Sequence, residues 1–149
     1  MENFLNAWII KAYILKKNTI NTDLAPQPIG PYEQAIDING FIYTAGQIAI
    51  DPKTKKLISG NIKDETTQSL NNLEAILSSG GSSKSKIVKI TIFVTDFSHF
   101  NHVNDAFSSF FENREFPARS TVGVSTLPMG AKVEIECVAY IDKWFTVIY

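Results

Sequence analysis

The chain has 149 residues, of which 44% are hydrophobic and 19% charged. This is enough apolar material for the core of one ordinary domain and too little length for two. The net charge of −1 excludes a broad basic surface that would bind nucleic acid through its phosphates. No segment approaches the roughly 20 apolar residues of a membrane-spanning helix. From the charge we expect no nucleic acid as a partner, and from the absence of such a segment no membrane.

The two ends of the chain differ from its middle. Residues 1–15 form an N-terminal extension, 16–140 the expected folded domain and 141–149 a C-terminal tail. In the extension, Trp8, Ala12 and Leu15 have helical spacing beside several lysines, which leaves an organellar targeting segment, mitochondrial or plastid, as one interpretation. The absence of arginine from the extension favours a cytoplasmic protein.

The first half of the domain predicts strands and a rigid loop. Lys17–Asn21 is expected as a short edge strand, and three prolines make Asp23–Pro31 an extended loop without regular pairing. Ala35–Ile38 and Phe41–Ala45 flank Asn39-Gly40, whose two residues tolerate the positive φ of a tight turn. A β-hairpin is therefore predicted here.

Two amphipathic helices are predicted. The first has Asp64 as its N-cap and ends at Gly80-Gly81; the second has Asp96 as its N-cap and ends before Phe116-Pro117. Their apolar residues recur at steps of three and four: Leu70, Leu73, Ile76 and Leu77 in the first, and Phe100, Val103, Phe107 and Phe110 in the second.

Three further strands complete the pattern. Lys86–Thr95 is expected as a central strand that is apolar on both faces, with Ile87 on one face and Val88 on the other. Arg119–Ser125 and Lys132–Tyr140 are expected as adjacent strands at the end of the domain. The resulting α+β fold is a single mixed sheet with both helices on one face. Its second face needs a cover, so we expect a homo-oligomer.

Metal, thiol and phosphate chemistry find little support in the sequence. His99 and His102 are one helical turn apart, but no third ligand is specified, so no metal site is predicted. Cys137 alternates inward on a strand, as a small core residue does. Gly80-Gly81 follows a helix instead of preceding one, which does not fit a phosphate-binding loop. No cofactor is expected.

The pair Arg119 and Glu134 is the strongest candidate for chemistry. Arg114 and Arg119 are the only arginines, and an arginine can bind a carboxylate through two parallel hydrogen bonds. The pattern leaves two interpretations open: a site for a small carboxylate, or an ordinary cross-strand ion pair between Arg119 and Glu134 on a solvated sheet face.

Several short blocks stand in a specific order between about Lys17 and Ala139. They are Ala25-Pro26, Ile29-Gly30-Pro31-Tyr32, Thr44-Ala45-Gly46-Gln47, Gln68-Ser69-Leu70-Asn71-Asn72-Leu73, Phe116-Pro117-Ala118-Arg119-Ser120, Leu127-Pro128 and Val133-Glu134-Ile135-Glu136. In this order and spacing the sequence resembles the reactive intermediate deaminase family, also called the RidA or YjgF family.

The resemblance implies a fold, an assembly and an activity. The fold is chorismate-mutase-like, and the assembly is a homotrimer with three clefts between subunits. The activity is that of a 2-iminobutanoate/2-iminopropanoate deaminase, a hydrolase that limits metabolite damage without a cofactor. Enamines such as 2-aminoacrylate and 2-aminocrotonate tautomerise to 2-imino acids, which are hydrolysed to 2-keto acids and ammonia.

The resemblance also assigns site residues. Arg119 would bind the substrate carboxylate and Glu134 would position or deprotonate the attacking water. Other expected substrate-binding residues are Tyr32, Ala45, Gly46, Asn104 and Thr121. The alternatives are a packed aromatic for Tyr32 and an ordinary polar helix residue for Asn104.

Two positions depart from the family pattern. Ala45 stands where the family commonly has serine, and Thr121 where it often has cysteine. The missing hydroxyl favours a second interpretation, in which the cleft is a non-catalytic site for small carboxylates or for another protein. RNA cleavage, a third function attached to the family by name, is disfavoured by the few and dispersed basic residues.

Overall fold

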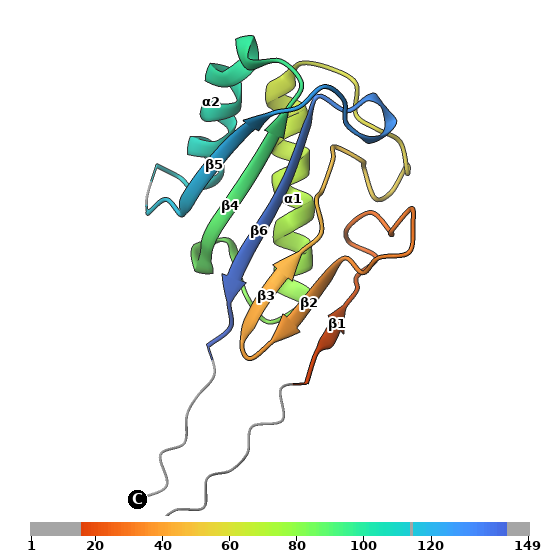
Figure 1. The fold of residues 1–149 in the computed structure, drawn as a ribbon, viewed down its shortest axis with the longest axis vertical. Helices are drawn as coiled ribbons and strands as arrows, with labels where there is room; N and C mark the ends of the chain where they lie inside the picture. The colour runs from red at the N-terminus through yellow and green to blue at the C-terminus, as the bar shows by residue number, and fades with distance from the viewer. Residues whose placement is uncertain (1–15, 114, 143–149) are drawn as a thin grey trace, which may run out of the picture.

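The computed structural model describes residues 16–113 and 115–142; the extension 1–15 and the tail from 143 onward lie outside the described residues. One six-stranded sheet has the order β1-β2-β3-β6-β4-β5. Its strands are β1 (Asn18–Ile20), β2 (Ala35–Ile38), β3 (Phe41–Thr44), β4 (Ile87–Val94), β5 (Ala118–Gly123) and β6 (Val133–Tyr140). The helices α1 (Ile62–Ser79) and α2 (Phe100–Phe110) both lie behind the sheet, as Figure 1 shows. The predicted α+β fold, with two helices on one face of a mixed sheet, is confirmed.

The hairpin and the edge strand form as predicted. β2 and β3 pair antiparallel around Asn39 and Gly40, whose φ angles are 52° and 82°. The Gly40 N–H donates to Asp37 Oδ1 at 3.2 Å, which closes the turn. β1 pairs with β2 at the outer edge of the sheet.

The last two strands are not neighbours, and this part of the prediction is wrong. β5 pairs parallel with β4, whereas β6 lies between β3 and β4 and is antiparallel to both. The reason is the connection through α2, because a strand–helix–strand crossover places the second strand parallel beside the first. The other side of β4 is then open for β6.

The helix ends follow the predicted chemistry with one shift. Helix α1 begins at Ile62, and its N-cap is Asn61 instead of Asp64. The Asp64 N–H donates to Asn61 Oδ1 at 2.9 Å, and the Asn61 amide donates back to Asp64 Oδ2 at 2.8 Å. This reciprocal pair resembles a capping box. Gly80-Gly81 ends the helix as predicted, with Gly81 at a φ of +81°.

Asp96 also caps a helix, but a different one. Its carboxylate accepts from the Ser98 N–H at 2.8 Å, so it caps the short 3-10 helix Phe97–His99 that precedes α2. The predicted apolar stripes of the two helices form the core with the inward residues of the sheet, except Phe100, which is only half-buried and lies beside the Arg119 guanidinium instead. Cys137 is part of this core, as expected. Within residues 16–113 and 115–142, no helix is long and apolar enough to cross a membrane.

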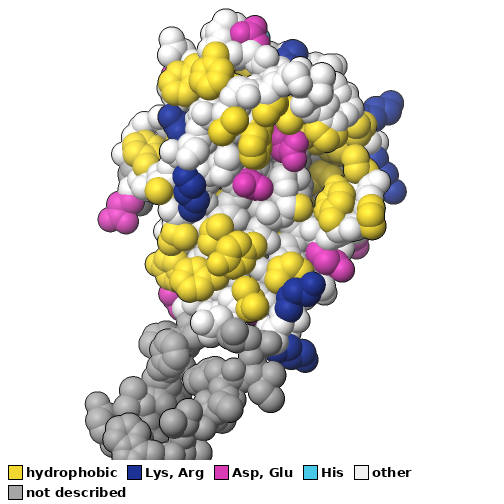
Figure 2. Space-filling model, viewed as in Figure 1, with side chains coloured by type: hydrophobic (Ala, Val, Ile, Leu, Met, Phe, Trp, Pro, Cys, Tyr) yellow, Lys and Arg dark blue, Asp and Glu magenta, His cyan; other side chains and the backbone are white. Residues whose placement is uncertain are grey.

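The other sheet face is left open by the helices. Strand register places Phe41 beside Tyr140, and Tyr43 beside Val138, on this face. Phe41, Tyr43 and Tyr140 are exposed, and Figure 2 shows apolar side chains gathered on this side of the molecule.

The central strand contributes less apolar surface to this face than predicted. An irregularity between Ile87 and Lys89 buries Ile87 and exposes Val88, which reverses the expected sides of these two residues. The open face of β4 also carries polar Lys89 and Thr91 beside β6 residues such as Glu136.

Candidate active site

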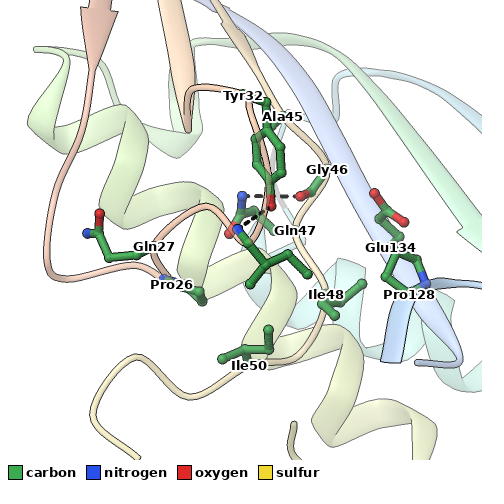
Figure 3. A pocket seen from close by; sticks show the side chains of 11 residues that line it. Pro26, Gln27, Tyr32, Ala45, Gly46, Gln47, Ile48, Ile50, Pro128 and Glu134 are labelled. Carbon is green, nitrogen blue, oxygen red and sulfur yellow. Dashed lines mark hydrogen bonds between the residues drawn. The ribbon is translucent and has the colours of Figure 1, made fainter. Parts of the chain in front are cut away.

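A pocket of about 320 Å³ lies where the chain leaves β3, beside β6 and under the proline-rich loop. Figure 3 shows Tyr32, Gly46 and Glu134 around it, with Pro26 and Ile50 on its apolar side. Four of the predicted site residues line it together: Tyr32, Ala45, Gly46 and Glu134.

A bulge after β3 shapes the pocket. Tyr43 pairs with Val138 and Gln47 with Ile135, so the segment from Tyr43 to Gln47 is one residue longer than the segment that it faces. The Gln47 N–H donates to the Ile135 carbonyl at 2.8 Å, and the Ile135 N–H donates back at 3.0 Å. An extra residue in one strand locally bends it, and here the bend carries Gly46 toward Glu134.

Gly46 leaves room for the Glu134 side chain. A Cβ added at Gly46 would overlap the Glu134 carboxylate, and would lie only 2.7 Å from its carboxyl carbon. Real Cβ atoms essentially never come this close to another heavy atom. Gly46 is therefore needed for close approach of the backbone, while its φ is not in the left-handed region.

The Glu134 carboxylate lies in surroundings that raise its affinity for a proton. Partial burial raises its pKa above the ordinary value, and the negative charge of Glu136 on the same strand raises it further. Among the described residues, Glu134 forms no side-chain hydrogen bond or ion pair. Its oxygens are therefore available within the protomer to a bound water or ligand.

Tyr32 forms one wall of the pocket. Its hydroxyl oxygen accepts a hydrogen bond from the Ile29 N–H at 3.2 Å, which links the ring to the proline-rich loop. The side chain is 46% exposed, so it is not a packed aromatic behind that loop. It can contact a ligand without any rearrangement of the loop.

Gln34 holds the loop and was missed by the sequence analysis. Its buried amide donates to the carbonyls of Thr22 at 3.0 Å and Pro26 at 2.9 Å, and its Oε1 accepts from the Thr22 N–H at 2.7 Å. Its backbone carbonyl accepts from the Ala45 N–H at 2.9 Å. Gln34 thus connects two walls of the pocket. A long polar residue beside a buried strand and a proline loop is the signal that could have identified it.

Asn72 holds a third wall and was also missed. It lies on the buried face of α1, and its amide donates to the carbonyls of Ile48 at 3.2 Å and Ile50 at 2.9 Å. Its own oxygen accepts from Gln68 at 2.8 Å. An asparagine within the apolar stripe of a helix is a signal for such a buried anchor.

Arg119 lies outside this pocket. It pairs in register with buried Ile90, so its side chain lies on the helix-covered face of the sheet, near the β5 edge. Its Nη1 donates to Asn104 Oδ1 at 2.8 Å, and the guanidinium lies 4.9 Å from the centre of the Phe107 ring. Thr121 pairs in the same way with buried Ile92 and shares this face.

The predicted site residues therefore form two groups on opposite faces of the sheet. Glu134 pairs in register with Phe93 on the open face, whereas Arg119 and Thr121 lie on the helix side. The cross-strand Arg119–Glu134 ion pair is wrong, since β4 separates their strands. In the described part of the chain, Arg119 has no acidic partner within 4.0 Å. Its charge is held by an amide and aromatic rings and is not neutralised by them.

The remaining candidates contribute no second centre. Burial raises the pKa of the Cys137 thiol to about 12, so the thiol stays protonated at neutral pH. His99 and Asp96 lie on an exposed surface, with 3.9 Å between His99 Nε2 and Asp96 Oδ2. Across residues 16–113 and 115–142, no three His, Cys, Asp or Glu side chains gather as a metal site would require.

Fold and site together define a class of protein. It is a small α+β domain with one open sheet face, and its pocket combines an unpaired carboxylate with an aromatic wall and apolar residues. Such a pocket suits a small molecule that carries both polar and apolar groups.

The chain belongs to the reactive intermediate deaminase (YjgF) family. The family model described as Endoribonuclease L-PSP matches residues 22–141. A 2-iminobutanoate/2-iminopropanoate deaminase of Dermatophagoides farinae is 44% identical over 85% of this chain and 98% of its own length.

Solved structures agree with this assignment. YyfA of Yersinia pestis, a member of the conserved Rid family, is 48% identical, with a TM-score of 0.82 over 85% of this chain and 100% of its own. Escherichia coli TdcF, solved with bound serine, is 36% identical, with a TM-score of 0.80 over 84% of this chain and 99% of its own.

Proposed function

We propose that this protein hydrolyses 2-imino acids to 2-keto acids and ammonia, at a site shared by two copies of the chain. The observation that carries the proposal is the separation of Glu134 and Arg119, each without a charged partner among the described residues, on opposite faces of one sheet. A molecule of three or four carbons cannot reach around the sheet to contact both. A second copy would bring its own Arg119 to the Glu134 pocket.

The assembly that fits this arrangement is a ring of identical subunits. We propose that the ring is a homotrimer. The pocket and the Arg119 surface are different patches, so contact between them is head-to-tail and closes by rotation. The open sheet face, with exposed Phe41, Tyr43 and Tyr140, supports burial against other copies. Each ring of three would contain three equivalent sites.

Arg119 would bind the substrate carboxylate. The guanidinium can form two parallel charge-assisted hydrogen bonds with a carboxylate, and Asn104 already fixes one side of the fork. This holds C2 of the substrate in a defined position. TdcF with bound serine is a family structure that holds a small amino acid, which supports a ligand carrying a carboxylate.

Glu134 would then activate water at C2. The carboxylate takes a proton from water as the water oxygen adds to the carbon of the protonated C=N bond, giving a carbinolamine. Protonated Glu134 then returns this proton to the amino group, which leaves as ammonia. The C2 hydroxyl gives its proton to the Glu134 carboxylate, and the 2-keto acid remains. The raised pKa of Glu134 makes it a stronger base for the first step. The name of the Dermatophagoides farinae relative, 2-iminobutanoate/2-iminopropanoate deaminase, supports this reaction.

One observation favours a second function. Ala45 lines the pocket without the hydroxyl that the family commonly has there. The second function is therefore binding of a small carboxylate without its chemical conversion. A coupled assay separates the two functions: a dehydratase generates 2-aminoacrylate, and pyruvate formation is recorded with and without this protein. Acceleration above the spontaneous rate supports the deaminase, and its absence together with pyruvate binding supports the carboxylate binder.

A further inference from the structure

The Glu134 pocket adjoins a second cavity, which is also lined by the proline-rich loop. The second cavity has a volume of about 480 Å³ and includes Pro28, Pro52 and Met129 in its lining. Pro26, Gln27, Ile29 and Ile50 line both cavities. These four residues are therefore the partition between them.

Ile50 is the buried member of the partition. It is 8% exposed, whereas Ile29 is 63% exposed and belongs to the surface of the loop. The Ile50 carbonyl accepts from Asn72, and its N–H donates to the Ile48 carbonyl at 2.8 Å, so the backbone at this position is held. The backbone of Ile50 is thus anchored to α1 through Asn72.

The orientation of a bound substrate directs its side chain toward this partition. In Figure 3 the polar side of the pocket is formed by Tyr32, Gly46 and Glu134. Ile50 lies on the opposite side near Pro26, and Ile48 lies between Ile50 and Glu134. The carboxylate and C2 of an imino acid occupy the polar side under the proposed function. The apolar side remains for the substrate side chain.

We propose that Ile50 sets the maximum side-chain length of the 2-imino acids that this protein accepts, by closing the pocket against the second cavity. This inference rests on the proposed function. Short aliphatic side chains fit in the pocket in front of Ile50. Longer unbranched side chains clash with the Ile50 side chain. Removal of the Ile50 side chain joins the two cavities and admits them.

Ile48 supplies a matched control. It is also 8% exposed, belongs to the same small apolar cluster and has its carbonyl held by Asn72. It lines the first cavity and is absent from the lining of the second. Ile48→Ala therefore widens the pocket without opening the partition.

The test compares Ile50→Ala, Ile48→Ala and the unaltered protein on a series of 2-imino acids with unbranched side chains of increasing length. An amino-acid oxidase generates each imino acid in the assay from the corresponding amino acid. We expect Ile50→Ala to raise kcat/KM for the longest substrate relative to the shortest by about tenfold or more, and Ile48→Ala to leave this ratio within about twofold. Equal shifts in both variants, or no shift in Ile50→Ala, would overturn the inference. Ile50→Val replaces Ile50→Ala if the latter does not fold, with a smaller shift in the same direction.

Binding separates this inference from the proposed function. The affinities of 2-oxobutyrate and 2-oxooctanoate are measured by calorimetry for the same three proteins. An unaltered protein that binds 2-oxobutyrate but hydrolyses no imine removes the deaminase proposal. The ratio of the two affinities still decides the role of Ile50: an increase for the longer acid in Ile50→Ala alone supports it, and an unchanged ratio refutes it.

Discussion

Arg119 and Glu134 face opposite sides of the same sheet, with β4 between the strands that carry them. Arg119 is oriented by Asn104 on the helix side, and Glu134 lies against Gly46 on the open side. Each residue has what the other lacks for hydrolysis of an imino acid: a fixed positive charge in one case and a basic carboxylate in the other. Hydrolysis at this site therefore requires contact between two copies of the chain.

Substitution of Arg119 should test the carboxylate clamp. Arg119→Ala removes charged hydrogen bonds that typically contribute about 1.5–3 kcal/mol, so kcat/KM for 2-iminobutanoate should fall by about tenfold to a hundredfold or more. Arg119→Lys keeps the charge and loses the fork, and should remain impaired. Steady-state kinetics measures both. Full activity in Arg119→Lys would show that a point charge is sufficient.

Gly46→Ala should displace the Glu134 side chain, because the added Cβ would overlap its carboxylate. We expect kcat to fall by about tenfold or more. The free energy of unfolding should change by less than the activation free energy that corresponds to this loss of kcat. Gly60→Ala is the matched control, since its Cβ would meet only Asp64 Oδ2, at 3.9 Å. Equal activity of the two variants would show that the position of Glu134 is unimportant for the reaction.

The pH profile should report the raised pKa of Glu134. The base is active when deprotonated, so kcat/KM should decline as the pH falls through that pKa. Glu136→Gln removes a negative charge that raises the pKa of Glu134, and should move the acidic limb of the profile to lower pH. Ratios of variant to unaltered protein at each pH cancel the titration of the substrate. A limb that does not move in Glu136→Gln would contradict the assignment of Glu134 as the base.

Gln34→Met should loosen the loop that carries Tyr32. The change leaves the partly buried Thr22 N–H and the carbonyls of Thr22 and Pro26 without this partner, at a cost of about 1–3 kcal/mol in the free energy of unfolding. KM should rise as well. Thr66→Val is the control, since its buried hydroxyl donates only within α1, to the Ile62 carbonyl at 2.7 Å. Urea unfolding measures the loss of stability, and steady-state kinetics measures KM. A KM that changes equally in both variants would count against a positioning role for Gln34.

Ala45→Ser should restore the hydroxyl that the family commonly has in this pocket. One neutral hydrogen bond contributes about 0.5–1.5 kcal/mol, so kcat/KM should rise by at most about tenfold. If the unaltered protein is only a carboxylate binder, the serine variant should show deaminase activity that the unaltered protein lacks. A serine variant less active than the alanine protein would show that the pocket is adapted to alanine.

Local chemistry in the sequence was sufficient for most of the elements. Asn39-Gly40 predicted the hairpin because both residues tolerate the positive φ that the turn needs, and the apolar steps predicted the buried faces of α1 and α2. The shift of the α1 cap from Asp64 to Asn61 has a simple cause, since both residues are good caps and bond to each other.

The relationships that the sequence analysis missed or predicted wrongly are long-range. The place of β6 between β3 and β4 depends on how α2 crosses the sheet, which no short pattern records. For the same reason the cross-strand Arg119–Glu134 pair was a reasonable but wrong alternative. Gln34 and Asn72 were missed because their partners are mostly backbone carbonyls, of the neighbouring loop for Gln34 and of a segment more than 20 residues away for Asn72, and a backbone carbonyl has no signature in residue type.

Mixing two inactive variants tests the shared site most directly. Arg119→Ala and Glu134→Gln chains are unfolded together, mixed in equal amounts and refolded, and 2-iminobutanoate hydrolysis is measured against each variant refolded alone. If the site takes Glu134 from one copy and Arg119 from its neighbour, random assembly should restore about a quarter of the activity of the unaltered protein. Activity no greater than that of the separate variants, in a mixture shown to be assembled, would contradict the account.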